Sequence, residues 1–202
     1  MQKKSIFIIF IIFFLVAPCS ARSKYFDLGI ALSSGYNFHT DGDLAKEHTL
    51  YNDSDAKRIL AGLNADATIH ITEPLSFFAG ADSFADFNFK DDYYYHTIDF
   101  AFYAGIKIFP GFHGFNCSIS YALGSRMDFV NIITTTNEEE IQPLKGSEMT
   151  SWGNGFRITA EYDFLYDTDS NICPFAGFCY RFMPRGNNNY DNILTAYVGL
   201  RF

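Results

Sequence analysis

Acidic and basic residues recur at alternate positions along this 202-residue chain, as at Glu161 and Asp163. Alternate positions share one face of an extended strand. The chemistry open to such a face is ion pairing, because a charge that is enclosed without a partner is very costly. The residues that we expect to form one ion-pair network are Asp66, Asp82, Asp86, Asp99, Lys107, Arg126, Arg157, Glu161, Arg181 and Arg201.

The spacing of the histidines gives little support for a catalytic site. A membrane-embedded deacylase would need His and Ser two residues apart on one strand face, so that the imidazole can activate the hydroxyl. The histidines are His39, His48, His70, His96 and His113, and none has Ser at that spacing. His70 with Thr72 is the nearest match, and His96 lies near Tyr95 and Asp99. We interpret these histidines as structural and predict no catalytic residue.

One acidic segment resembles the start of a calcium loop. Residues 167–171 read Asp-Thr-Asp-Ser-Asn. The full motif needs Gly at its sixth position and Glu at its twelfth, where this chain has Ile172 and Phe178. A polar turn explains the composition better. We therefore predict no metal site and no cofactor.

The N-terminus reads as a secretory signal. Lys3 and Lys4 precede an almost wholly apolar stretch, and Cys19-Ser20-Ala21 supplies small residues for cleavage. We expect cleavage after Ala21, which leaves residues 22–202 as one domain. A lipid-modified Cys19 is the alternative, but Pro18 stands where a small residue is needed.

Charge and cysteine content limit the partners further. The formal net charge is −8, and an acidic chain without a basic cluster is a poor nucleic-acid binder. The expected mature domain keeps Cys117, Cys173 and Cys179. An odd number leaves at least one thiol free, and we expect these cysteines to pack as small apolar residues.

The elements that must position the charges are strands, because the hydrophobic period is two. Each segment has one apolar face and one small or polar face, and each can cross a bilayer. Phe78 and Phe84 are exceptions that point to the polar side. The pattern predicts an all-β fold: an eight-stranded antiparallel up-and-down transmembrane β-barrel. The expected strands span about 26–38, 59–71, 75–89, 98–108, 115–127, 152–164, 174–182 and 194–202.

The connections alternate in length as such a barrel requires. Tight turns are expected at Thr72–Pro74 and Pro110–His113, on the periplasmic side. Long acidic loops are expected near 39–57 and 130–150, on the outside. Residues 131–136 could extend above the membrane as strand and offer an edge to a partner. Divalent-cation binding by these loops is an alternative to a merely solvated surface.

The last residues carry an assembly signature. Phe202 follows Leu200, Val198 and Ala196 at alternate positions, which resembles the C-terminal strand that the barrel assembly machinery reads. The mature chain as a whole resembles small outer-membrane barrels of the OmpA, OmpX and OmpW kind. This resemblance implies a bacterial outer-membrane location and contact with outer-membrane lipid.

We expect the charged face to line the lumen, because the interior of eight strands is only wide enough for their own side chains. The predicted function is therefore structural or surface-interacting, with an extracellular ligand reached through the outer loops. A narrow channel or carrier for small or hydrophobic molecules is the alternative. A lipid-modifying enzyme is the least favoured interpretation.

Overall fold

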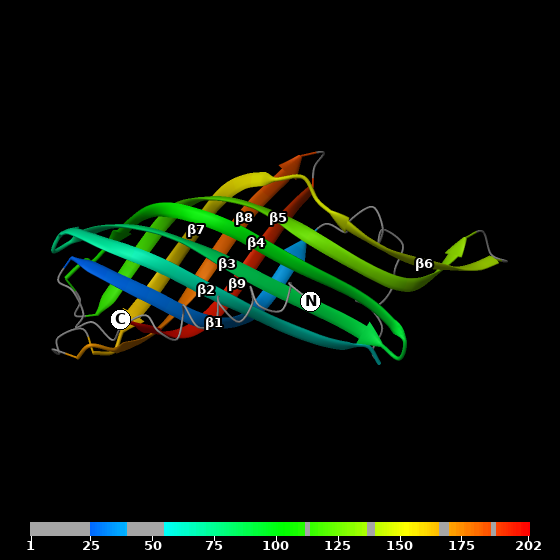
Figure 1. The fold of residues 1–202 in the computed structure, drawn as a ribbon, viewed down its shortest axis with the longest axis horizontal. Coiled ribbons are helices and arrows are strands. Elements are labelled where there is room, and N and C mark those ends of the chain that lie inside the picture. The colour runs from blue at the N-terminus through cyan, green and yellow to red at the C-terminus, as the bar shows by residue number, and fades with distance from the viewer. Residues whose placement is uncertain (1–24, 40–54, 112–113, 137–139, 166–169, 187–188) are drawn as a thin grey trace, which may run out of the picture.

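The structure is a computed structural model that describes residues 25–39, 55–111, 114–136, 140–165, 170–186 and 189–202. Strands make up the described fold (Figure 1), and no helix in these ranges is long and apolar enough to cross a membrane. The strands are β1 (Phe26–His39), β2 (Lys57–Thr72), β3 (Leu75–Lys90), β4 (Tyr93–Ile108), β5 (Phe115–Thr136), β6 (Glu140–Met149), β7 (Gly153–Asp163), β8 (Cys173–Gly186) and β9 (Asn189–Arg201).

Eight of these strands close into a ring. Their order around the wall is β1-β2-β3-β4-β5-β7-β8-β9, every pair is antiparallel, and β9 pairs with β1 to complete the circle. β6 lies outside the ring because it pairs only with the far end of β5. The eight-stranded up-and-down barrel predicted from the sequence is therefore confirmed.

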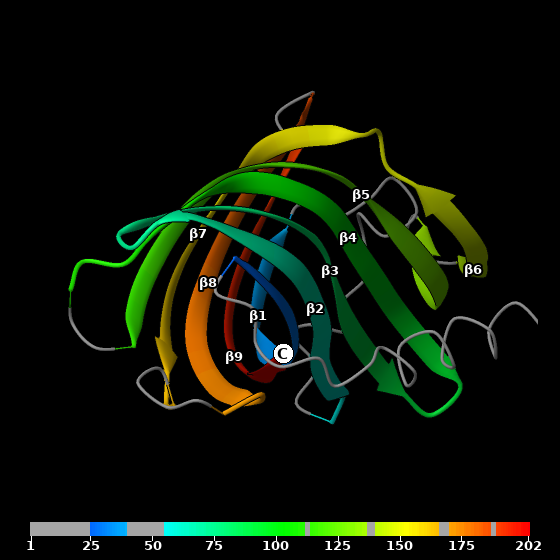
Figure 2. The same cartoon turned by 60° about the vertical axis from the view of Figure 1, so that its left-hand side comes forward.

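The segment expected as a long loop near 130–150 is largely strand. β5 continues for 22 residues to Thr136, and β6 returns along it in register from Thr136↔Glu140 to Met127↔Met149. β6 and the end of β5 form a two-stranded ribbon that projects beyond the rest of the barrel (Figures 1 and 2). The β-branched run Ile132-Ile133-Thr134-Thr135-Thr136 favours strand over loop.

A short interruption separates β6 from β7, so that both run along the same side of β5. On one side of the interruption Gly124 of β5 pairs with Gly153 of β7, and on the other side Met127 of β5 pairs with Met149 of β6. Thr150 fills the interval: its backbone carbonyl accepts a hydrogen bond from Ser125 Oγ at 2.7 Å, and its Oγ1 accepts one from the Arg126 backbone N–H at 3.0 Å. The wall stays continuous through this break.

The two faces of each strand of the ring have opposite surroundings. Leu32, Phe178 and Val198 point outward and are 68%, 66% and 64% exposed, whereas Asp99 and Arg157 point inward and are buried. The apolar side chains thus cover the outside, as expected from the sequence. Phe78 and Phe84 are buried on the inner face, which confirms their predicted direction.

Most connections agree with the expected lengths. Only Glu73 and Pro74 separate β2 from β3. The connection between β3 and β4 is Asp91-Asp92, where Asp91 has φ of 51°, a left-handed conformation that Asp tolerates. The last hairpin is tighter than expected, since β8 runs to Gly186 and β9 begins at Asn189. The expected signal peptide, most of the first loop and residues 167–169 of the calcium-like segment lie outside the described residues.

A charge on the outer face tests the membrane-facing assignment. We expect Val198→Arg to destabilise the lipid-inserted barrel by about 2–4 kcal/mol, because arginine near the bilayer midplane is poorly solvated. The measurement is urea unfolding in vesicles. Asp92→Arg, in an exposed turn, is the control and should stay within about 0.5 kcal/mol of wild type. Equal behaviour of the two variants would contradict the assignment.

Candidate functional site

The most extensive polar structure in the described barrel is a chain of alternating charges on the inner face. Within it, Arg185 Nη2 lies 3.1 Å from Asp99 Oδ2, and Arg126 binds Asp128 through two hydrogen bonds of 2.7 and 3.0 Å. Each arginine is matched by an aspartate, so the formal charges cancel. The chain runs Arg157–Asp82–Arg181–Asp99–Arg185–Asp191–Arg126–Asp128.

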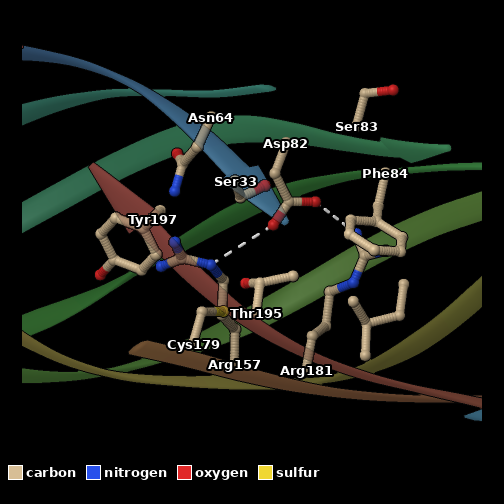
Figure 3. A pocket seen from close by; sticks show the side chains of 11 residues that line it. Ser33, Asn64, Asp82, Ser83, Phe84, Arg157, Cys179, Arg181, Thr195 and Tyr197 are labelled. Carbon is tan, nitrogen blue, oxygen red and sulfur yellow. Dashed lines mark hydrogen bonds and ion pairs between the residues drawn. The ribbon is translucent and has the colours of Figure 1, made fainter. Parts of the chain in front are cut away.

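Asp82 is the point at which this chain contacts open space. Its carboxylate lies between two guanidinium groups, those of Arg157, with Nε at 3.3 Å, and of Arg181 (Figure 3). Its side chain is 17% exposed, whereas that of Asp99 is fully buried. A cavity of about 20 Å³ lies beside it, which is room for one water molecule.

A second neutral cluster surrounds Glu161. The Glu161 carboxylate accepts hydrogen bonds from Lys107 Nζ at 2.9 Å, from Arg201 Nη2 at 2.9 Å and from the Tyr197 hydroxyl at 2.8 Å. Arg201 also pairs with Asp163. Two cations and two carboxylates therefore balance in this part of the barrel as well. Gly177 leaves room for the Tyr197 ring, since a Cβ there would lie 2.8 Å from its hydroxyl.

Aromatic rings support the buried guanidinium groups. The Arg157 guanidinium carbon lies 4.2 Å from the Tyr103 ring centroid, and that of Arg201 lies 4.4 Å from the Phe175 centroid. The negative face of an aromatic ring attracts a cation. The Tyr103 hydroxyl also donates to Asn64. These contacts hold the cations in place without adding charge.

One histidine makes hydrogen bonds on both sides of its ring. His70 Nδ1 lies 2.8 Å from Ser76 Oγ, and His70 Nε2 lies 2.8 Å from Asp27 Oδ2. Sequence spacing missed this Ser-His-Asp arrangement because the three residues come from β3, β2 and β1. Ser76 is fully buried, so a substrate cannot reach its hydroxyl, and the bonds position the ring.

All ten residues expected in the network lie on the inner face, and nine of them form an ion pair. Asp66 differs: its carboxylate accepts a hydrogen bond from Thr68 Oγ1 at 3.2 Å and forms no ion pair among the described residues. It faces Gly29, and the nearby Arg201 is already held by two carboxylates.

Sequence reasoning missed four charged partners: Arg58, Asp128, Arg185 and Asp191. Asp86, for example, pairs with Arg58 at 2.5 Å. These four residues lie just beyond the ends of the strands expected from the sequence, because the strands are longer than a bilayer requires. Even spacing along the strands could have identified two of them, because Asp128 is two residues from Arg126 and Arg185 is four residues from Arg181, which places each pair on one strand face.

Cysteines and metal ligands add no further site within the described part of the chain. Cys117, Cys173 and Cys179 are free thiols, and the last two are buried. No group of three or more His, Cys, Asp and Glu side chains in the described residues is placed to hold a metal ion.

The C-terminal strand is fixed on both edges. Val198 and Leu200 are exposed on the outer face. Phe202 exchanges backbone hydrogen bonds with Leu28 at 2.8 and 3.0 Å, next to the β1–β9 ladder. Ala196 and Val198 belong to that ladder, opposite Ser34 and Leu32. Recognition of this strand by assembly machinery stays a prediction.

Comparisons with known proteins give likeness in fold. No family model matches the chain, and no curated protein matches its sequence. The solved structure of Ail, the attachment invasion locus protein of Yersinia pestis, superposes with a TM-score of 0.51 at 8% identity, over 89% of this chain and 100% of that chain. The chain therefore has the architecture of small outer-membrane barrels.

Two further solved structures are similar to this chain. Neisserial surface protein A has 14% identity and a TM-score of 0.47, over 88% of this chain and 97% of that chain. The outer membrane protein OprG of Pseudomonas aeruginosa has 11% identity and a TM-score of 0.42, over 91% of this chain and 98% of that chain.

Removing one enclosed carboxylate should unbalance its cluster. We expect Glu161→Gln to destabilise the barrel by about 3–5 kcal/mol, because Lys107 is left without its counter-ion. Adding Lys107→Met should restore at least half of the loss, since Arg201 keeps Asp163. Urea unfolding in detergent measures both variants. Lys90→Met, which removes an exposed pair, should cost no more than about 1 kcal/mol.

Proposed function

We propose that this chain is an integral outer-membrane protein with a plugged lumen, which acts through its outer surface and not by transport or catalysis. The neutral charge chain from Arg157 to Asp128 carries this proposal. Its members come from six of the eight ring strands, β3, β4, β5, β7, β8 and β9, and they are buried except at Asp82. An eight-stranded barrel has little interior beyond such side chains.

The outer face supports the membrane location. Exposed apolar side chains lie on all eight strands of the ring, and large aromatic residues such as Trp152, Tyr162 and Phe164 lie near strand ends. Transmembrane barrels carry an apolar band between aromatic girdles. The expected signal peptide at residues 1–21 and the C-terminal signature agree with export to the outer membrane.

The ribbon of β5 and β6 is the proposed contact surface. It projects from the end of the barrel opposite the C-terminus (Figure 1), which is the extracellular end if the C-terminus is periplasmic. β6 contains Pro143, which has no N–H to donate, so we assign strand pairing to the edge of β5 beyond Asn131. An extended peptide of an extracellular partner can pair with such an edge. The name of Ail describes attachment, a role of the kind proposed here.

A narrow channel is the second candidate, and the cavity at Asp82 is the observation that favours it. This cavity lies at the Arg157 end of the ionic chain, beside Asp82 and Arg181, and has room for one water molecule. If the pairs of Asp82 separate in the native protein, small solutes gain a path. Conductance discriminates between the two candidates.

We expect no steady conductance from the wild-type protein in a planar bilayer. Asp82→Ser combined with Arg157→Ser removes one matched pair and leaves Arg181 bound to Asp99, so this variant should fold and show small steady openings. Lys90→Met is the surface control and should show no steady conductance. Steady wild-type openings that persist without the ribbon would favour the channel instead.

Shortening the ribbon tests the surface role. Residues 132–144 are removed, and Asn131 is joined to its partner Lys145 through an Asn-Gly turn. We expect unchanged heat-modifiable migration on a detergent gel, because the ring is intact, and loss of most binding of cells to host matrix. If cells with the shortened ribbon still bind host matrix as wild type does, the ribbon is not the contact surface.

A further inference from the structure

The barrel wall is incompletely paired between β1 and β2. Their ladder ends at Ser33↔Gly62. β1 nevertheless continues along β9 to His39↔Asp191, and β2 begins along β3 at Lys57↔Phe89. Residues 34–39 and 57–61 thus flank a seam without ladder pairs between these described segments, and β1 and β2 diverge toward it in Figures 1 and 2. We call these two segments the β1–β2 seam.

Side chains bridge the seam in place of a backbone ladder. Ser34 Oγ donates to the Leu60 carbonyl at 2.8 Å, and Arg58 Nη2 donates to the Asn37 carbonyl at 3.5 Å. The Arg58 guanidinium carbon also lies 4.8 Å from the Tyr36 ring centroid. These few contacts can break without unfolding the ring, because β9 and β3 hold the two strands from their other edges.

Buried polar atoms without a partner lie behind the seam. Asn37 is 3% exposed, and neither its amide nitrogen nor its amide oxygen has a hydrogen-bond partner. The side-chain oxygen of Asn88 is also buried and unpartnered. Asn88 stands opposite Arg58, which bonds to Asn37. Buried polar groups are nearly always hydrogen-bonded, so this group points to a ligand with both donors and acceptors.

Charge and exposure define the rest of that ligand. Arg58 is already neutralised by Asp86 through contacts of 2.9 and 2.5 Å, so the site offers no net charge to an ion. On the outer side the seam is flanked by Tyr36, Phe38 and Ile59, all exposed to the surroundings of the barrel. A polar interior behind apolar flanks suits an amphiphile.

We propose that the β1–β2 seam binds an amphiphile with an uncharged hydrogen-bonding head and one apolar chain. The head replaces the missing partners of Asn37, and the chain lies against Tyr36, Phe38 and Ile59. The inference rests on the membrane location in the proposed function, since the ligand enters from the bilayer side.

Decanamide is the probe, titrated into the protein in nanodiscs by calorimetry. We expect saturable binding at one site per barrel, and weaker binding of decyl sulfate, whose charge finds no counter-ion. Asn37→Leu should weaken decanamide binding by about tenfold or more. Asn116→Leu is the matched control, because Asn116 is also buried with both amide atoms unpartnered but lies on β5, and it should bind as wild type does.

A disulfide tests the position of the site. Ser34→Cys with Ala61→Cys links the two sides of the seam, and the oxidised form should lose binding that a reductant restores. Leu32→Cys with Leu63→Cys links a laddered pair and should leave binding unchanged. Wild-type affinity in Asn37→Leu or in the oxidised form of the seam variant, or an equal loss in Asn116→Leu, overturns the inference.

Gel mobility of the unboiled protein, read from the same nanodisc sample, separates the two proposals. An inserted, heat-modifiable barrel that fails to bind decanamide overturns only the proposed amphiphile site at the seam. A chain that does not insert overturns the membrane location and the seam together.

Discussion

Charge neutrality inside a narrow wall is the constraint on which this structure depends. Eight strands enclose too little volume to hydrate ionised side chains freely, so each cation needs a carboxylate within reach. The chain that includes Asp82 and Asp99 and the cluster around Glu161 both meet this condition. Because the charges are matched inside, the outer face of the ring can be largely apolar.

The alternation of residues was sufficient to predict the barrel, because a period of two fixes which face each side chain takes. Nine of the ten charges expected on the inner face are buried, and the side chain of Asp82 is 17% exposed. The alternation could not predict which of these charges pair with one another. Arg181 pairs with Asp82 from a strand 99 residues away, and only closure of the ring brings them together. The Ser76–His70–Asp27 contacts depend on register between three strands in the same way.

Strand length was the second feature that the sequence did not predict. Bilayer thickness suggests 9–11 residues for each strand, but β5 has 22 and β2, β3 and β4 have 16 each. The additional residues include Arg58 and Asp128, which lie just beyond the strand ends expected from the sequence. The same extension produces the ribbon of β5 and β6, and the local loss of β1–β2 pairing could not be inferred from composition.

The long sequence separation of the ion pairs has a consequence for biogenesis. Arg185 meets Asp99 across 86 residues, and Arg126 meets Asp191 across 65. A half-built sheet that entered the bilayer would expose these groups as bare charges in hydrocarbon, where each is poorly tolerated. Insertion and closure should therefore be concerted, with the final hairpin completing the neutralisation. Truncation from the C-terminus would then abolish insertion outright, and no stable smaller barrel would form.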